Sequence, residues 1–564
     1  MKAERAATIN DYLRRLAHER PDQEVIVTYN SRLERASLRA AELYALASRF
    51  AKLLKDAGLR RGEYVIISLP NSLEETVTSL GVNLAGGVSV AVEVFLNTGD
   101  TFFEVLHKTK SRFLITSRSE SDMAWSLIRE STKPGAANIP LLHVTKTNRA
   151  PTLEYSFLVD RSADNNLLTL LRRQKEGYDC PYVRPEDLCV AFTTANNTSF
   201  VCLVVHTHAS TIEGALQAQS HVMTGTTRFL YTKPPTWILS TPGMLLLLGV
   251  TRVRFDQWEA LGEKDSYQLM VRVIEKEGVD MAFMLAAEAA KLVETWSPRP
   301  FPMIKQMVVG AMPVTAKLAA RVVPGCEILT NVYASSEMQL ISYNSITSAD
   351  QFQDFDSGVF CKGIEGRIVD ADFRDLPEDQ SGRILLRSAG MFHHYEGQPD
   401  EDTQTKFTND GYYDTGDAGC QRQDGHLLVM GRKDDMIMHN VWNVHPSWIE
   451  KHIKTHPDIQ QVIVVPIPDE VNFQNICACV IRKLGGCDLT EEGVKGHFRT
   501  NYVEDEKDSI CPTDVLFMDS FPESRPGRVD RKKLADYATD IILKSKIAAA
   551  GVEAIQKILN GSKN

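Results

Sequence analysis

Apolar residues recur along this chain with two alternating spacings. The segment AAELYALASRFAKLLKDAG places Leu43, Leu46 and Phe50 on one face of a helix. It is followed by YVIISL, Tyr64 to Leu69, an almost wholly apolar run of strand length, and the same succession recurs at RFLIT and MVVGA. Helices that alternate with strands apolar on both faces predict α/β layers with strands buried on both sides.

The pattern changes near GRKDD, residues 431–435. Beyond it, a helix from Pro446, the strands QVIVVPI and ICACVIRK, a helix around Glu491 and the strand DVLFMDS predict a second α/β domain of roughly a hundred residues. The predicted organisation is a large N-terminal domain of several subdomains over residues 1–431, a small mobile C-terminal domain over residues 432–540, and a helical extension over residues 541–564.

Composition excludes several classes of protein. The chain has 564 residues, of which 43% are hydrophobic and 24% charged, as in ordinary soluble globular proteins. Its net charge of -10 argues against a nucleic-acid partner, because duplex binders present a basic face. No apolar run approaches the roughly 20 residues that span a bilayer, and the N-terminus lacks a secretory apolar core. Ten cysteines without a C-x-x-C pair indicate reduced thiols, so we expect a cytoplasmic protein.

A series of short motifs carries the candidate chemistry. DGYYDTGD and DGHLLVMGRKDD are the most specific, NVYASSEM and GAMPV precede them, and LAGGVSVAV, SGRILLRSAGMFHHY and PESRPGRVDRKKL complete an ordered set. Walker and G-x-G-x-x-G loops are absent from the sequence. Over residues 1–540 the set resembles the AMP-forming adenylate enzymes, which include acyl- and aryl-CoA synthetases, beetle luciferases and peptide-synthetase adenylation domains. The resemblance implies their large AMP-binding domain and small mobile domain.

The resemblance also implies a nucleotide site. Asp417 would accept hydrogen bonds from both ribose hydroxyls, because the two oxygens of a carboxylate match a vicinal diol. Arg432 would lie beside the same ribose, and Asp434 would be the hinge between the domains. Tyr333 would stack on adenine, although a buried core tyrosine fits the same position equally well. Glu337 would bind Mg²⁺, a hard cation that prefers carboxylate oxygen. The remaining nucleotide-binding residues would be Gly310, Ala311, Met312, Ser336, Thr194 and Thr198.

The loop TTANNTSFVCLVVHTH departs from the family pattern Thr-Ser-Gly-Thr-Thr-Gly-x-Pro-Lys-Gly, whose amides and lysine hold the outer phosphates of ATP. Thr194 and Thr198 keep two hydroxyl donors, but Cys202 stands at the lysine and Leu203 at the last glycine. The catalytic lysine near the C-terminus is replaced by Arg528, which keeps the charge with another geometry. We therefore predict a site that prefers AMP or an acyl-adenylate over ATP.

The substrate is less well defined by the sequence. Leu246 stands at the histidine of the family's acyl pocket, and His208 matches the histidine after the phosphate loop; a structural histidine bonded to backbone is the alternative for His208. The surroundings of Leu246 and Met284 are apolar, which indicates a hydrophobic acyl or aryl acid, although a core helix has the same pattern. Val441 replaces a glycine that borders the CoA tunnel in the family, which should narrow the passage.

Two functions from different classes fit these observations. One is an acyl-CoA-synthetase-like ligase that uses Mg²⁺ and ATP to form acyl-AMP and then transfers the acyl group to CoA, with Arg528 and Glu337 catalytic. We expect impaired ATP turnover, because losing one preorganised electrostatic contact costs about 10²–10³ in rate. The other is a catalytically inactive protein that binds AMP, an acyl-adenylate, acyl-CoA or a fatty acid as a sensor or sequestering protein. A luciferase-like use has no specific support.

Overall fold

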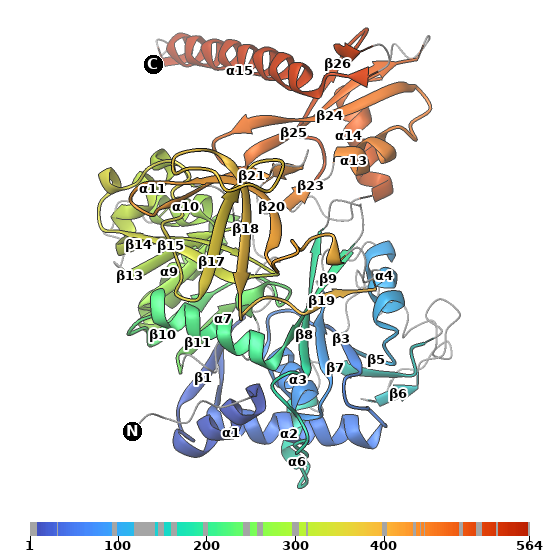
Figure 1. Cartoon of the computed structure of the whole chain (residues 1–564), viewed down its shortest axis with the longest axis vertical. Helices are drawn as coiled ribbons and strands as arrows, with labels where there is room; N and C mark the ends of the chain where they lie inside the picture. Colours follow the sequence, from blue (N-terminus) through green and yellow to red (C-terminus); the bar gives the residue numbers. More distant parts are fainter. Residues whose placement is uncertain are drawn as a thin grey trace. The chain divides into compact units, whose positions relative to one another are not determined.

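The computed structural model describes residues 8–30, 32–92, 99–117, 142–144, 152–159, 166–195, 201–240, 249–255, 263–295, 304–311, 314–397, 403–432, 436–439, 442–444, 446–483, 489–502, 510–525 and 528–561. The chain divides into two compact units, of which the larger ends at Gly431 and the smaller contains Arg432–Asn564 (Figure 1). This confirms the predicted α/β fold with a large N-terminal and a small C-terminal domain.

An eight-stranded, mainly parallel sheet forms one layer of the larger unit, in the order β19-β9-β8-β4-β3-β5-β7-β6. Its strands are β3 (Tyr64–Ser68), β4 (Val88–Ala91), β5 (Phe113–Ser117), β6 (Leu142–Val144), β7 (Tyr155–Val159), β8 (Leu188–Ala195), β9 (Val201–Thr207) and β19 (His394–Glu396). The helices of this region are α1 (Ile9–Glu19), α2 (Ala40–Asp56), α3 (Leu73–Leu84), α4 (Gly99–Thr109), α6 (Leu167–Arg173) and α7 (His208–His221). The apolar stripe of α2 and the strand β3 lie where the hydrophobic pattern predicts them.

A second sheet has nine strands in the order β16-β15-β14-β13-β12-β10-β11-β1-β2. Its strands are β1 (Glu24–Tyr29), β2 (Arg35–Arg39), β10 (Arg228–Tyr231), β11 (Thr251–Phe255), β12 (Met281–Met284), β13 (Ile304–Gly310), β14 (Cys326–Ser335), β15 (Gln339–Ile346) and β16 (Val359–Phe360). The associated helices are η1 (Ile238–Ser240), α9 (Glu263–Glu277), α10 (Ala286–Thr295), α11 (Ala316–Val322), η3 (Val323–Gly325) and η4 (Ala349–Gln351). The central strands, from β1 to β14, pair in parallel.

Helix α3 connects these two layers. Every one of its residues is buried, and it contacts strands of both sheets, β3 and β4 of the first and β1 and β2 of the second. Ser72 begins the helix by accepting a hydrogen bond from the backbone N–H of Glu75, which satisfies one of the free amides of the first turn. A helix buried on all sides belongs between packed layers, and α3 therefore fixes the position of one sheet against the other.

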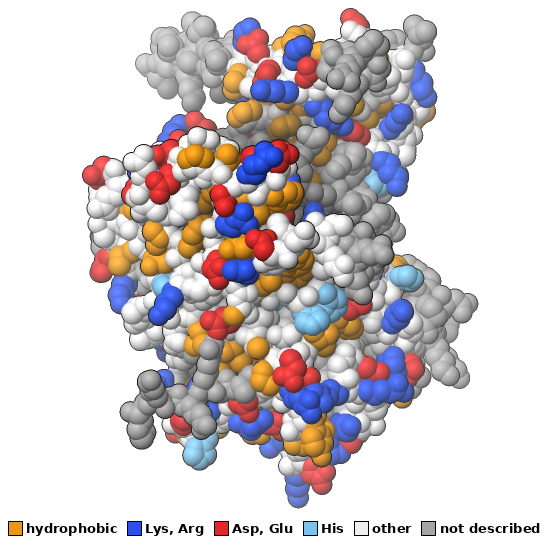
Figure 2. Space-filling view, viewed as in Figure 1, with side chains coloured by type: hydrophobic (Ala, Val, Ile, Leu, Met, Phe, Trp, Pro, Cys, Tyr) orange, Lys and Arg blue, Asp and Glu red, His pale blue; other side chains and the backbone are white. Residues whose placement is uncertain are grey.

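A third, antiparallel sheet completes the larger unit in the order β17-β18-β20-β21. Its strands are β17 (Ile364–Val369), β18 (Gly382–Ser388), β20 (Tyr413–Gln421) and β21 (Leu427–Arg432). On the face of this unit shown in Figure 2, acidic and basic side chains are interspersed, and its described residues form no extended basic area. Within the described ranges no helix combines the length and apolarity needed to cross a bilayer.

The smaller unit is built on a five-stranded sheet, β23-β22-β25-β24, with β26 beside β25. Its elements are β22 (Ile437–His439), β23 (Trp442–Val444), α13 (Pro446–Ile453), β24 (Ile459–Asp469), β25 (Phe473–Arg482), α14 (Glu491–Tyr502), β26 (Asp514–Phe517), β27 (Glu523–Arg525), β28 (Arg528–Val529) and α15 (Arg531–Gly561). Helix α15 begins at Arg531 and continues past residue 541, so the expected C-terminal extension is the continuation of a helix that packs on this domain through Leu534 and Ala538.

Candidate functional site

Tyr333 and Asp417, which come from different sheets, are in direct contact. The phenol of Tyr333 on β14 donates a hydrogen bond to Oδ2 of Asp417 on β20. The ladder between β14 and β15 is irregular at Tyr333, and such bulges redirect side chains next to functional sites. The backbone N–H of Asp417 donates to Oγ1 of Thr415 at 3.0 Å, and that hydroxyl donates to the carbonyl of Ile384 at 2.9 Å. The structure thus brings together the residues predicted to bind base and ribose.

Gly310 lies at the end of β13, one residue of register away from Tyr333. It pairs with Val332 of β14, and a Cβ placed on Gly310 would lie 2.7 Å from the Val332 carbonyl oxygen. Only glycine allows the backbones to approach so closely. Ala311 follows with a φ of +68°, a left-handed conformation that is uncommon for residues other than glycine. Gly310 and Ala311 therefore end β13 beside Val332, the residue that precedes Tyr333.

Glu337 lies in the turn between β14 and β15, where a buried tyrosine fixes it. Its Oε1 accepts a hydrogen bond from the phenol of Tyr395 at 2.9 Å, and the Tyr395 and Tyr413 hydroxyls are 2.9 Å apart. Burial, together with the charge of Glu337, raises the pKa of Tyr395 above its ordinary range, so the phenol stays protonated as a donor. Phe392 adds a backbone hydrogen bond to the carbonyl of Glu337 at 2.8 Å.

This arrangement fits a magnesium ion held together with a nucleotide. Oε2 of Glu337 has no hydrogen-bond partner among the described residues, so one oxygen is fixed and the other is available. Mg²⁺ is usually bound by one or two carboxylates together with substrate phosphates, rather than by a cage of protein ligands. The described part of the chain contains no group of three or more His, Cys, Asp or Glu side chains that could hold a metal ion.

His206 on β9 was not identified from the sequence, yet it supports the same turn. Its Nε2 lies 2.7 Å from the carbonyl oxygen of Ser336, and its Nδ1 lies 3.1 Å from Oγ of Ser210. Because a carbonyl only accepts, Nε2 carries the proton and the Ser210 hydroxyl donates to Nδ1. Burial lowers the pKa of His206 to about 4, which keeps the ring neutral near pH 7. Ser336 is thus held through its backbone.

His208 has the environment of a structural histidine. Its Nδ1 accepts a hydrogen bond from the backbone N–H of Ile9 at 3.3 Å, and the backbone N–H of His208 donates to the carbonyl of Asp187 at 3.0 Å. The side chain is buried, and burial lowers its pKa to about 4. The contact with Ile9 joins α7 to α1. The structure thus agrees with the alternative of a histidine bonded to backbone.

The strand that follows the phosphate loop is closed to solvent. Cys202 is only 1% exposed and belongs to the same apolar cluster as Tyr395. Leu203 is fully buried and pairs with Glu396 of β19. A small thiol therefore packs in the core at the position where the family pattern has a lysine, and no cationic group replaces that lysine on the described part of β9.

Other predicted site residues have only backbone positions or none. Arg432 is the last residue of β21, Arg528 opens β28 opposite Arg525, and Thr194 lies in β8 near its end; their side chains lie outside the described residues. The residues Thr198, Leu246, Met312, Asp434 and Val441 lie wholly outside them. Met284 ends β12 and is buried with Ala286 and Ala289 of α10, as expected of a core position.

Comparison with known proteins adds to this geometry. The family model described as AMP-binding enzyme matches residues 13–396, and the model of the AMP-binding enzyme C-terminal domain matches residues 448–528. The 4-coumarate–CoA ligase-like protein 1 of Arabidopsis thaliana is 23% identical over 87% of this chain and 88% of its own. The salicyl-AMP ligase / salicyl-S-ArCP synthetase of Mycobacterium tuberculosis is 23% identical over 93% and 90%. The amide bond synthetase McbA from Marinactinospora thermotolerans has a similar fold, with a TM-score of 0.74 and 20% identity over 93% and 99%.

Proposed function

Since the chain belongs to the family of AMP-binding enzymes, whose members activate acids as adenylates, we propose that it binds an adenylate through Tyr333 and Asp417 and acts as a ligase with weak ATP turnover. The proposal rests on a difference between the two ends of the nucleotide site. Tyr333 and Asp417, at the nucleoside end, are in hydrogen-bond contact, whereas the buried thiol of Cys202 stands where the family has the lysine that binds the outer phosphates. A site built in this way favours AMP or an acyl-adenylate over ATP.

In this proposal the described residues bind and orient rather than transfer protons. Asp417 accepts the ribose hydroxyls, and the ring of Tyr333 covers the adenine once its hydroxyl releases Asp417. Glu337, oriented by Tyr395, would hold Mg²⁺, which supplies positive charge to the phosphate oxygens when bound. The roles of Arg432, Asp434 and Arg528 follow from the motif pattern and stay predictions.

For the second half-reaction we propose transfer of the acyl group to CoA. The relatives differ in this step, because their names specify CoA, a carrier protein and an amide product respectively. Activation of the acid is the part they share, and it depends on the nucleotide site described above. CoA is the acceptor implied by the resemblance to acyl-CoA synthetases, although Val441 replaces the glycine at the family's CoA tunnel. We propose a hydrophobic acyl or aryl acid as substrate.

A second function is favoured by the burial of Cys202 and Leu203. If no other group replaces the missing lysine, the protein retains the adenylate without forming it, and it acts as a sensor or sequestering protein for AMP, an acyl-adenylate, acyl-CoA or a fatty acid. Loss of the cation that balances the polyphosphate is sufficient for this outcome, since preorganised charges contribute the largest part of catalysis in such sites.

The two functions are distinguished by trapping the intermediate. The protein is incubated with ATP, Mg²⁺, hydroxylamine and a panel of aliphatic and aromatic acids, and hydroxamate is measured. Hydroxamate that forms with an acid and disappears in the Glu337→Gln variant supports the ligase. A blank panel together with AMP binding by calorimetry supports the non-catalytic function. Absence of both hydroxamate and AMP binding would contradict the whole proposal.

A further inference from the structure

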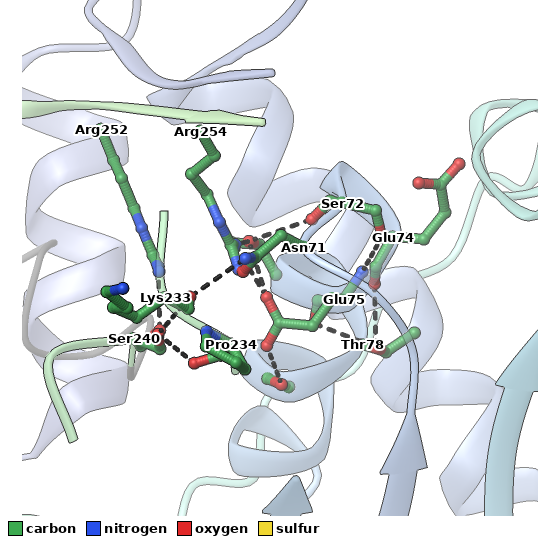
Figure 3. A network of polar contacts seen from close by, with 12 residues as sticks. Asn71, Ser72, Glu74, Glu75, Thr78, Lys233, Pro234, Ser240, Arg252 and Arg254 are labelled. Carbon is green, nitrogen blue, oxygen red and sulfur yellow. Dashed lines mark hydrogen bonds and ion pairs between the residues drawn. The ribbon is translucent and has the colours of Figure 1, made fainter. Parts of the chain in front are cut away.

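Two arginines are buried side by side between the layers of the larger unit. Arg252 and Arg254 alternate with Val253 and Phe255 along β11, so their side chains leave the strand on one face, opposite the apolar residues. They are 2% and 0% exposed; Arg254 extends toward Asn71 and the N-terminal end of α3, whereas Arg252 extends toward Ser240 (Figure 3). Fully buried arginines are rare unless each is paired with an acceptor.

Arg254 is paired with a carboxylate, although its Nε is buried without a hydrogen-bond partner among the described residues. Its Nη1 donates to Oε2 of Glu75 at 2.9 Å and to Oγ1 of Thr76 at 3.0 Å, while Nη2 donates to Oδ1 of Asn71. The other carboxylate oxygen of Glu75 accepts from the hydroxyl of Ser79 at 3.0 Å. Glu75 is therefore used by Arg254 and by its own helix, and this ion pair fastens β11 to α3.

Arg252 is not compensated. Its Nη1 donates to the carbonyl oxygen of Ser240 at 2.8 Å, and its guanidinium lies 5.3 Å from the centre of the Tyr231 ring. Its Nε and Nη2 are buried and have no hydrogen-bond partner among the described residues. Burial and the neighbouring charge of Arg254 lower the pKa of Arg252, against the opposing effects of Glu75 and Tyr231.

The two free donors form one edge of the guanidinium. Nε–H and Nη2–H point in parallel, and this edge matches the two oxygens of a carboxylate. No described carboxylate fills it. Glu75 is held by Arg254, and Glu288 lies against Nζ of Lys233, at 2.5 Å and 2.6 Å from its two oxygens. The chain thus presents a buried bidentate donor whose natural partner is missing from the described residues.

The side chains beside this edge include aromatic residues of β10 and β12. The Tyr231 ring under Arg252 also packs against Phe283, with ring centroids 5.5 Å apart, and Phe283 contacts Trp237 at 6.4 Å. An aromatic surface therefore lies next to the free donors.

We propose that the Nε/Nη2 edge of Arg252 binds a carboxylate, and that this carboxylate is the second acidic group of the acid that the protein activates. The second part of the proposal rests on the proposed ligase function, whereas the binding of a carboxylate does not. The substrate is then an aryl or acyl dicarboxylate, with one carboxyl group directed to the nucleotide and the other held by Arg252. The alternative is that the carboxylate bound by Arg252 belongs to a free monocarboxylate such as acetate.

Ligand binding without ATP tests the site independently of catalysis. Thermal unfolding of the full chain is measured in Tris chloride with terephthalate or glutarate, with the matched monoacids benzoate and butyrate, and with acetate. We expect the diacids to raise the melting temperature at concentrations at least tenfold below those of any monoacid. An equal response to acetate would assign the edge to a free anion and overturn the substrate part. No response to any acid would overturn the whole proposal.

Variants of Arg252 identify the group responsible. Arg252→Lys keeps the charge but loses the planar edge, so diacid binding should weaken at least tenfold. Arg252→Met should abolish it, while the melting temperature without ligand should stay the same or rise, because an uncompensated buried charge is removed. A lower melting temperature would contradict the proposal and indicate a structural role. If Arg252→Met does not fold, Arg252→Lys decides. Arg184→Met, at an exposed arginine, should respond to diacids like the wild type.

Hydroxamate formation with the same acids then separates the two proposals. An Arg252-dependent thermal response without any hydroxamate would leave the carboxylate site intact and remove the ligase. Hydroxamate from monoacids at wild-type rates in Arg252→Lys would leave the ligase intact and remove the diacid substrate.

Discussion

The phenol of Tyr333 donates a hydrogen bond to Oδ2 of Asp417, across the junction between the nine-stranded and the four-stranded sheets. In this state the tyrosine occupies one of the two carboxylate oxygens that a ribose diol needs. If Asp417 binds ribose as proposed, ribose and Tyr333 compete for this carboxylate, and the phenol must move away when a nucleoside binds. The contact would then limit the affinity for the nucleotide.

Substitutions of Tyr333 and Asp417 should change AMP affinity according to whether they remove the hydroxyl, the ring or the charge. Tyr333→Phe removes the competing hydroxyl but keeps the ring, so we expect the dissociation constant for AMP to stay within about threefold of wild type or to fall. Tyr333→Ala removes the ring and should weaken AMP binding by about tenfold or more. Asp417→Asn loses the charged acceptor and should weaken it by a similar factor. Isothermal titration with AMP measures all three.

The matched control for these variants is Asp424→Asn, at an exposed aspartate in the turn between β20 and β21. It should bind AMP like the wild type. A tenfold loss of affinity in Tyr333→Phe would show that the hydroxyl contributes to binding and would contradict the competition between phenol and ribose.

Tyr395→Phe should affect the metal rather than the nucleoside. The change removes the donor to Glu337 and leaves the Tyr413 hydroxyl without this partner, which should lower the free energy of unfolding by about 1–2 kcal/mol. A less constrained Glu337 should raise severalfold the Mg²⁺ concentration needed for half-maximal ATP binding, with AMP affinity unchanged. Tyr412→Phe, at a partly exposed neighbour whose phenol donates to Glu365 instead of Glu337, is the control. An unchanged Mg²⁺ requirement would remove Tyr395 from the role of positioning residue.

Gly310→Ala should damage the site through the backbone. Its Cβ would lie 2.7 Å from the carbonyl oxygen of Val332, so β13 or β14 must move, and Tyr333 follows Val332 directly. We expect a loss of about 1–3 kcal/mol in stability and weaker AMP binding. Gly496→Ala in α14 is the control, because no atom lies within 4 Å of its Cβ position, and it should be neutral or slightly stabilising. Equal melting temperatures for the two variants would contradict this interpretation.

Stability should fall in mild acid because of two buried histidines. Burial lowers the pKa of His206 and of His208 to about 4, from an ordinary value of 6.5. The unfolded chain therefore binds more protons between pH 6.5 and about 4, so this contribution is complete above pH 6.5 and is lost as the pH falls toward 4. Each histidine adds a slope of up to about 1.4 kcal/mol per pH unit.

Urea unfolding of wild type and His206→Gln at pH 7.5 and pH 5.5 measures this effect. The wild type should lose more stability between the two values than the variant does, because the variant has one fewer group that takes up a proton on unfolding. Identical losses would show that His206 does not titrate as its burial predicts.

The sequence predicts the layers of this fold well, because the apolar spacing of segments such as Ala40–Asp56 is set by their own side chains. It also identifies Tyr333, Glu337 and Asp417 as candidate site residues, since they belong to motifs with a fixed local order. The contact between Tyr333 and Asp417 could not be predicted in this way. It depends on how two sheets far apart in sequence pack together, and on a bulge that no local pattern marks.

The residues missed by the sequence are mostly buried polar groups. Arg252 and Arg254 alternate with apolar residues in TRVRF, as side chains on one face of a strand do. Their shared face could therefore be predicted from the sequence. The ion pair of Arg254 with Glu75 could not be predicted, because Glu75 has the sequence context of an ordinary acidic residue in the first turn of a helix. His206 has the same limitation, since its partner is a backbone carbonyl. Burial and pairing are properties of the packed layers.

The central claim is that the nucleotide site keeps its residues for the nucleoside but lacks the lysine that binds the outer phosphates of ATP. Isothermal titration of the wild type with AMP and, separately, with ATP and Mg²⁺ tests this directly. We predict that AMP binds at least as tightly as ATP·Mg²⁺. Binding of ATP·Mg²⁺ tenfold more tightly than AMP would contradict it, because another group would then have to compensate for the buried thiol of Cys202.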